Sequence, residues 1–175
     1  MNHKVYVISA NRYNDLPFNK QQKEKYIFCV KNGQKELYEE NGCKQVYNTG
    51  NLMDSRNFAL EHAFENNNIC IQLSDDIKKV TTNKNFFKKK IVKLDEAIED
   101  IVSKFIKIKG VYLMGVPPTD NYFFANKLVL ENKFCIGDML FVKPNELRFD
   151  TQLSLKEDYD YTLQHIQKAK VLRYQ

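Results

Sequence analysis

The chain contains no tryptophan, and its six glycines and four prolines are too few for a loop-dominated or fibrous protein. It has no apolar run of about 18 residues, so the sequence predicts no membrane-spanning helix and no membrane partner. The first residues, MNHKVYVISANRYND, lack the apolar core of a signal peptide. We therefore expect a cytoplasmic protein.

Cysteine is also scarce, and the pattern of the four cysteines argues against a zinc site or a redox couple. Cys29, Cys70 and Cys135 sit within apolar runs, and Cys43 follows a glycine. No C-x-x-C pair occurs, which disfavours a zinc site or a redox couple. We expect four reduced thiols, most of them in the core.

What the chain does contain fits one globular domain. Its 175 residues are 43% hydrophobic and 13% aromatic, enough for a single sizeable core, and we find no repeat or linker. The net charge of +5 weakly favours a polyanionic partner such as a nucleotide or nucleic acid. Lysine and asparagine are abundant throughout, however, so composition alone also accounts for that charge.

Apolar runs alternate with amphipathic segments along the chain. The expected strands are residues 4–10, 25–30, 44–48, 69–73, 110–116, 133–143 and 170–175. The expected helices are residues 35–42, 54–67, 93–107 and 155–169, and the third has its apolar residues at helical spacing. This alternation predicts an α/β domain with a mixed, mostly parallel sheet flanked by helices.

The stretch ICIQLSDDIKKV, residues 69–80, places Asp75 and Asp76 directly after a buried strand. Ligands of open α/β sheets bind outside the carboxyl ends of the strands. Adjacent carboxylates repel each other, and a hard cation such as Mg²⁺ or Mn²⁺ offsets that repulsion while also binding phosphate oxygens. Taken alone, the pair is more often a polar turn.

Other polar residues at expected strand ends favour the site. Ser9 and Arg12 follow the first strand, and Arg56 lies in the first turn of a helix, where a phosphate is favoured. Glu157 and Asp158 begin a later helix. Each has an ordinary alternative, a surface arginine or acids that suit a helix N-terminus, but together they point to a nucleotide site.

These motifs resemble those of GT-A fold glycosyltransferases. The segment NLMDSRNFAL…ICIQLSDDIKKV is similar to their helix and strand that end in a D-x-D-type metal motif, and RFDTQLSLKEDYDYTLQHI to their later acidic motif. The match is closest to small phage glycosyltransferases associated with TET/JBP-type oxygenases, thought to glycosylate hydroxymethylated pyrimidines in DNA. The resemblance implies one GT-A domain, residues 1–175, with a nucleotide-sugar half (1–80) and an acceptor-binding and catalytic half (81–175).

The resemblance also implies roles for individual residues and a Mn²⁺ or Mg²⁺ cofactor. It assigns the metal to Asp76, with Asp75 near the ribose or the metal, and the nucleotide to Ser9, Arg12 and Arg56. Asp158 becomes the catalytic base beside Glu157, and Gly137 and Asp138 line the sugar and acceptor side. His165, two helical turns after Asp158, is a further candidate metal ligand, although a lone helix histidine is more often a packing residue. Ser74 departs from the pattern, which predicts a weaker metal site.

The implied reaction moves a sugar from a UDP-sugar to a hydroxyl of 5-hydroxymethylcytosine in DNA, with inversion if Asp158 is the direct base. TTNKNFFKKKIVK, with Phe86 and Phe87, and YFFANK, residues 122–127, suit contact with phosphates and stacking on bases. A solvated lysine run with phenylalanines in the core accounts for the first segment at least as well.

Three other functions remain open at this stage. The acceptor of the sugar can be a protein, a glycan or a nucleoside. The domain can bind nucleotides without catalysis, which Ser74 in place of an acid favours. A nucleotidyltransferase shares the acidic pair and the parallel sheet. The sequence does not indicate the oligomeric state.

Overall fold

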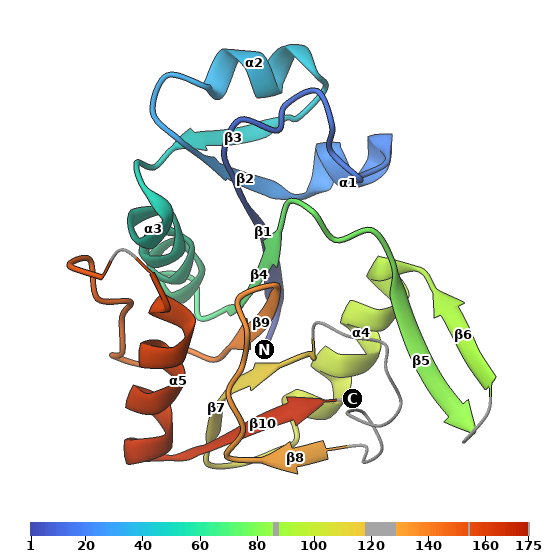
Figure 1. Cartoon of the computed structure of the whole chain (residues 1–175), viewed down its shortest axis with the longest axis vertical. Coiled ribbons are helices and arrows are strands. Elements are labelled where there is room, and N and C mark those ends of the chain that lie inside the picture. Colours follow the sequence, from blue (N-terminus) through green and yellow to red (C-terminus); the bar gives the residue numbers. More distant parts are fainter. Residues whose placement is uncertain (86–87, 118–128, 154, 175) are drawn as a thin grey trace.

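The computed structural model describes residues 1–85, 88–117, 129–153 and 155–174, which form one α/β domain built on a single large sheet (Figure 1). The sheet has eight strands in the order β3-β2-β1-β4-β9-β7-β10-β8. In chain order they are β1 His3–Ser9, β2 Ile27–Val30, β3 Gln45–Asn48, β4 Ile69–Ser74, β7 Val111–Gly115, β8 Val129–Glu131, β9 Met139–Val142 and β10 Lys170–Tyr174.

The sheet is mixed and mostly parallel, as the sequence predicts. Strands β1 to β4 pair in parallel, and β7 pairs in parallel with β10. Between these two groups lies β9, which is antiparallel to both β4 and β7. The edge strand β8 is antiparallel to β10. All strands except β8 and β9 therefore end at the same edge of the sheet.

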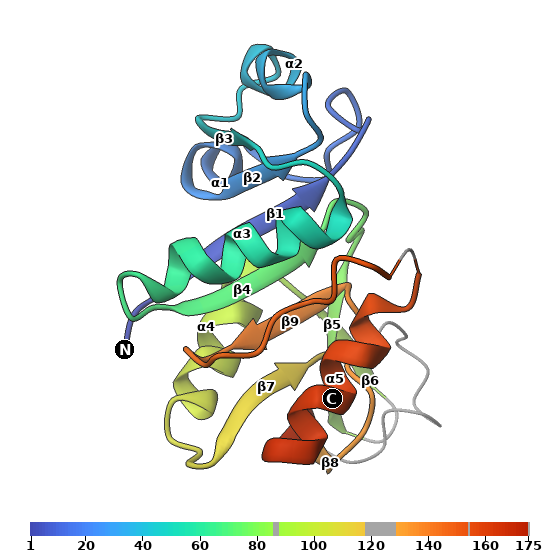
Figure 2. The same ribbon diagram turned by 90° about the vertical axis from the view of Figure 1, so that its left-hand side faces the viewer.

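Helices cover both faces of this sheet (Figure 2). Alternate residues of β1 show the division: Val5 and Val7 belong to one core cluster, and Tyr6 and Ile8 to the other. The first cluster includes the apolar face of α4, Leu94–Phe105, and the second includes residues of α3, Leu52–Phe64, and α5, Glu157–Lys168. Both faces of the central strands are thus buried, which explains their continuous apolar sequences.

The shorter elements lie around this framework. Helices α1, Lys20–Lys25, and α2, Lys35–Glu40, flank the β2–β3 end of the sheet. Strands β5, Val80–Asn85, and β6, Lys88–Val92, pair as a separate antiparallel sheet where the sequence pattern suggested only a lysine-rich connection. Phe86, Phe87 and residues 122–127, named above as nucleic-acid contacts, lie outside the described residues.

The predicted strand over residues 133–143 is too long. Only Met139–Val142 pair as β9, and the residues before it run beside α5, where Cys135 bonds to Thr162. The predicted state of the cysteines is confirmed, because all four are free and buried. Burial raises the pKa of the Cys135 thiol to about 12, so it stays protonated at neutral pH. Among the described residues, no helix has both the length and the apolar composition needed to cross a membrane.

Candidate functional site

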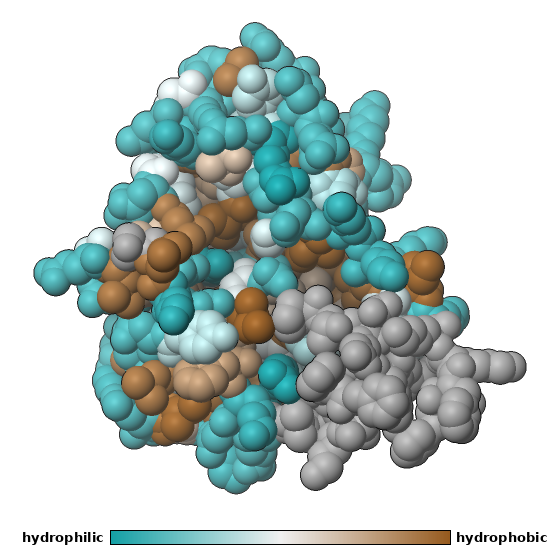
Figure 3. All heavy atoms as spheres, viewed as in Figure 1, coloured by the Kyte–Doolittle hydropathy of each residue, from teal (hydrophilic) through white to brown (hydrophobic). Residues whose placement is uncertain are grey.

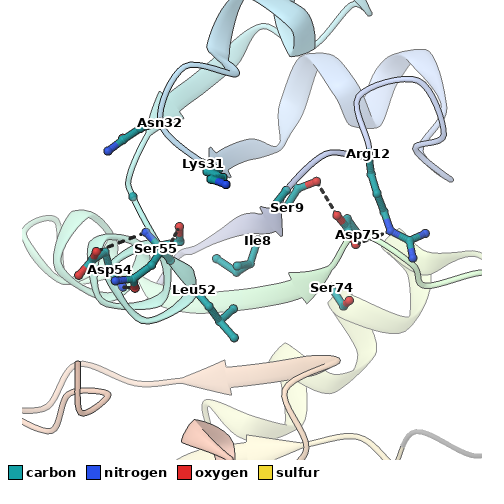
Figure 4. A pocket seen from close by; sticks show the side chains of 13 residues that line it. Ile8, Ser9, Arg12, Lys31, Asn32, Leu52, Asp54, Ser55, Ser74 and Asp75 are labelled. Carbon is teal, nitrogen blue, oxygen red and sulfur yellow. Dashed lines mark hydrogen bonds and ion pairs between the residues drawn. The ribbon is translucent and has the colours of Figure 1, made fainter. Parts of the chain in front are cut away.

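A cavity of about 710 Å³ opens at the carboxyl ends of strands β1 to β4 (Figure 4). This is the edge of the sheet at which the sequence places its polar clusters. The lining residues are Ile8, Ser9, Ala10, Arg12, Lys31, Asn32, Gly50, Asn51, Leu52, Asp54, Ser55, Ser74 and Asp75. Each parallel strand contributes the residues at or just beyond its end, so the topology itself assembles the site.

Ser9 and Asp75 meet because their strands pair in parallel. Ile8 lies opposite Ser74, so the next residue of each strand reaches the cavity together. The Ser9 hydroxyl donates to Oδ2 of Asp75 at 2.6 Å and lies 2.6 Å from the Tyr38 hydroxyl. Since Ser9 has one proton to give, the Tyr38 hydroxyl must donate to Ser9, and it accepts from the backbone N–H of Arg12 at 3.2 Å. Burial raises the pKa of Tyr38, which keeps this donor protonated.

The second carboxylate oxygen of Asp75 faces Arg12. Nε of Arg12 lies 3.4 Å from Oδ1 of Asp75, and the carboxylate is 13% exposed against 44% for the arginine side chain. Both oxygens of Asp75 are thus engaged by protein groups. An ion pair with an exposed partner contributes less than about 1 kcal/mol to stability, so the arginine is available for a ligand at little cost.

Asp76 differs from its neighbour because it is exposed to solvent. The Ser74 hydroxyl donates to its Oδ1 at 2.6 Å. The resemblance expects an acid at position 74. The serine found there orients the carboxylate of Asp76 instead. No group of three or more His, Cys, Asp or Glu that could hold a metal occurs among the described residues. A magnesium-type cation commonly takes only one or two protein carboxylates and completes its shell with substrate phosphates, which these acids fit.

Arg56 is not among the residues that line the cavity, so its contact with the base or diphosphate stays a prediction. Its side chain is buried, and Nη1 and Nη2 donate to Oε1 of Gln72 at 3.1 Å and to the carbonyl of Gly137 at 3.3 Å. Its Nε lies 3.3 Å from Oε1 of Glu157 but is not aligned to donate a hydrogen bond to it. The guanidinium also lies over Phe149, 5.3 Å from the ring centroid. Arg56 therefore joins α3, β4, the segment before β9 and α5.

Asp158 lies in the first turn of α5. It bonds to the N–H of Gly137, whose carbonyl bonds to Arg56. Oδ2 of Asp158 accepts from the backbone N–H of Gly137 at 3.0 Å and its Oδ1 from that of Tyr159 at 2.9 Å. Asp138 follows Gly137 and connects this group to the end of β4, because its carbonyl accepts from the backbone N–H of Ser74 at 2.9 Å. The end of β4 and the first turn of α5, which carry the two acidic motifs of the sequence, are thereby brought to one region.

The pKa of Asp138 is raised above its ordinary value. Partial burial is the main cause, and the negative charges of Asp76 and Asp158 add to it, while Arg56 acts in the opposite direction. Asp138 is therefore within the electrostatic field of both the candidate metal ligand and the candidate base. The sequence assigned it only to the lining of the sugar and acceptor side.

His165 borders a different cavity from the one that Asp75 lines, which gives no support to its assignment as a candidate metal ligand. The residue is 1% exposed, and its Nδ1 donates to the carbonyl of Tyr161 at 2.9 Å. It borders a different cavity with Tyr112, which is at the start of β7 and so at the opposite edge of the sheet. The two turns of helix between Asp158 and His165 carry the histidine away from the site.

Sequence reasoning missed several lining residues. Lys31 and Asn32 follow β2, and Gly50 and Asn51 follow β3, so the strand-end rule that found Ser9 applied to them too. The exposed ammonium group of Lys31 has no partner among the described side chains and can meet an anion.

The residues after β3 begin helix α3 at the cavity. The Asn51 side chain accepts from the backbone N–H of Asp54, and the Asp54 side chain accepts from that of Asn51, which closes a capping box. The first turn of α3 is thus held at the cavity wall.

Comparisons of the chain with protein-family models, with curated proteins and with solved structures give no match.

Proposed function

We propose that the protein is a metal-dependent glycosyltransferase of the GT-A type, which transfers a sugar from a UDP-sugar to a hydroxyl group. One observation carries the proposal. The cavity at the ends of β1 to β4 holds the Asp75 network, and the segment Gly137–Asp138 connects that edge to Asp158 on α5. A donor bound in this cavity would thus lie beside, but apart from, the candidate base, as group transfer between two substrates requires.

The donor nucleotide would occupy the cavity. Asp75 is held by Ser9 and Arg12, so its carboxylate can accept a ribose hydroxyl without reorienting. Asp76 would bind Mn²⁺ or Mg²⁺ together with the diphosphate, and the cation would stabilise the charge of the leaving phosphate. The ammonium group of Lys31 supplies a second positive group on the cavity wall.

Asp158 would take the proton of the acceptor hydroxyl as it attacks the anomeric carbon. Two backbone N–H groups hold its carboxylate, which fixes its direction. General base catalysis of this kind contributes about 10²–10⁴-fold to the rate. A base that deprotonates the attacking hydroxyl directly leads to inversion at the anomeric carbon. Glu157 forms a buried ion pair with Arg56 and would support the site from its buried side.

On the basis of the family resemblance, the proposed acceptor is 5-hydroxymethylcytosine in phage DNA. Proteins, glycans and nucleosides are the other acceptors to test. A domain that binds nucleotides without catalysis is the second candidate function. It is favoured by Ser74, which replaces an acid and leaves Asp76 as the only exposed carboxylate of the pair.

Calorimetry with UDP, with and without Mn²⁺, tests the donor site, and mass spectrometry of hydroxymethylated DNA incubated with UDP-sugars tests transfer. We expect Mn²⁺-dependent UDP binding that Asp76→Asn removes, and transfer that Asp158→Asn lowers by about 10²-fold or more while UDP still binds. Asp100→Asn on the distant helix α4 is the matched control. UDP binding without transfer to any acceptor class would favour the binding-only function, and absence of UDP binding would overturn both.

A further inference from the structure

Two exposed aromatic side chains lie next to the candidate base. Phe134 and Tyr159 are each 44% exposed, and their ring centroids are 4.8 Å apart with an interplanar angle of 34°. Hydrophobic side chains gather on the face of the molecule over α5 (Figure 3). Large aromatic rings that remain in solvent beside a site are typical of ligand-binding surfaces.

The backbone on both sides of this pair is fixed. The Thr162 hydroxyl bonds to both the N–H and the carbonyl of Cys135, each at 3.2 Å, which fastens the residue after Phe134 to α5. Gly137 is bonded in turn to the Asp158 carboxylate at 3.0 Å. Tyr159 follows Asp158 directly in the helix. The backbone on both sides of the aromatic pair is therefore fixed near the candidate base.

Lysines flank the aromatic pair in the sequence. Lys133 precedes Phe134, and Lys156 lies in the turn before Tyr159. Both are exposed, and neither ammonium group has a partner among the described residues. Aromatic rings are enriched in protein–protein interfaces but lysine is depleted there, so the combination favours a ligand with flat rings and negative charge. Single-stranded nucleic acid has both.

We propose that Phe134 and Tyr159 form a stacking platform for the base of the acceptor nucleotide, with Lys133 and Lys156 contacting the neighbouring phosphates. This inference rests on the proposed glycosyltransferase function, since it places the acceptor next to Asp158. It makes the acceptor a nucleic-acid strand whose target base is unpaired or turned out of the duplex. A base stacked there would bring a hydroxyl on its exocyclic group toward the Asp158 side of the platform.

The test uses single-stranded DNA that contains 2-aminopurine, whose fluorescence falls when it stacks on an aromatic ring. The key variant is Phe134→Leu/Tyr159→Leu, which keeps an apolar surface but removes both π faces. We expect wild-type protein to bind the strand with quenching, and the double variant to bind about 10-fold or more weakly and without quenching. Phe134→Tyr/Tyr159→Phe should restore both signals. Tyr112→Ala, which removes a similarly exposed ring on β7, is the matched control.

UDP binding with Mn²⁺, measured on the same proteins, separates this inference from the proposed function. Intact UDP binding in the Leu variant shows that it is folded and that its loss concerns the acceptor only. If wild-type protein binds UDP but not the strand, or if the Leu variant binds the strand as wild type does, the platform is overturned and the glycosyltransferase proposal stands. A change of oligomeric state in the Leu variant with unchanged strand binding would make the pair a protein interface and also overturn it.

Discussion

A Cβ atom added to Gly137 would lie 2.1 Å from Nη2 of Arg56. The guanidinium fills the space that a side chain would need and donates to the Gly137 carbonyl at 3.3 Å. Gly137 is next to Asp138 and bonded to Asp158, so this close approach also sets the position of the two acids. Helix α3, which begins at the cavity, and helix α5, which carries the candidate base, are thus coupled through one arginine and one glycine.

Gly137→Ala should lower the free energy of unfolding by about 1–3 kcal/mol, because the new methyl group overpacks a buried site. Urea denaturation measures the change. The matched test repeats the substitution in an Arg56→Met background, where the guanidinium is gone and the alanine should cost much less. An equal cost in both backgrounds would show that the contact with Arg56 is not the reason for the glycine.

Arg56→Ala should lower the free energy of unfolding by about 3–5 kcal/mol, because it leaves the buried carboxylate of Glu157 without its partner. Arg56→Ala/Glu157→Gln should recover part of that loss, which urea denaturation of the single and double variants measures. Arg56 was expected from the sequence to contact the diphosphate. A stable Arg56→Ala protein that has lost UDP affinity would support that role and contradict the structural one.

The topology of the site could be predicted from the sequence, because apolar strand patterns and polar residues at strand ends follow from sheet geometry. This is why Ser9, Arg12 and Asp75 were expected together and lie together. Lys31 and Gly50 obey the same rule, but single residues after short strands form no recognisable motif. The separate sheet of β5 and β6 has a lysine-rich sequence that gives little strand signal.

The direction of long side chains could not be predicted. The helix places the Cα of Arg56 near the cavity. Its guanidinium turns inward, because Gln72 accepts a hydrogen bond from it and Gly137 has no side chain to occupy the space. A glutamine inside the apolar run ICIQL was the available signal, since a buried polar side chain needs a partner. The burial of His165 could not be predicted for a related reason, because helical spacing gives its face of the helix but not what that face packs against.

Asp138→Asn should stabilise the protein at neutral pH and not at low pH. The pKa of Asp138 is raised in the folded state, so the folded protein holds its proton more tightly than the unfolded chain. Its contribution to stability is full below the unfolded pKa and is lost as the pH rises through the folded value. The benefit of removing the charge should therefore begin as the pH rises above the unfolded pKa and be complete above the folded value. Urea denaturation at several pH values checks the trend, with Asp15→Asn in an exposed loop as the control. A benefit that is constant with pH would contradict it.

Ser74→Asp should make the protein depend more strongly on metal. A third acid at the end of β4 adds repulsion to Asp75 and Asp76, so the metal-free protein should lose stability. If the acids after β4 bind Mn²⁺ together with UDP, the extra carboxylate would be a further ligand, and the rise in Tm on adding Mn²⁺ should exceed that of the wild type. Thermal unfolding with and without Mn²⁺ measures both effects. Ser74→Ala, which only frees Asp76 from its hydrogen bond, is the control and should leave the Mn²⁺ response near that of the wild type. If Ser74→Asp loses stability but gains nothing from Mn²⁺, the acids after β4 do not bind the metal, and the charge of the diphosphate would have to be met by Arg12 and Lys31 instead.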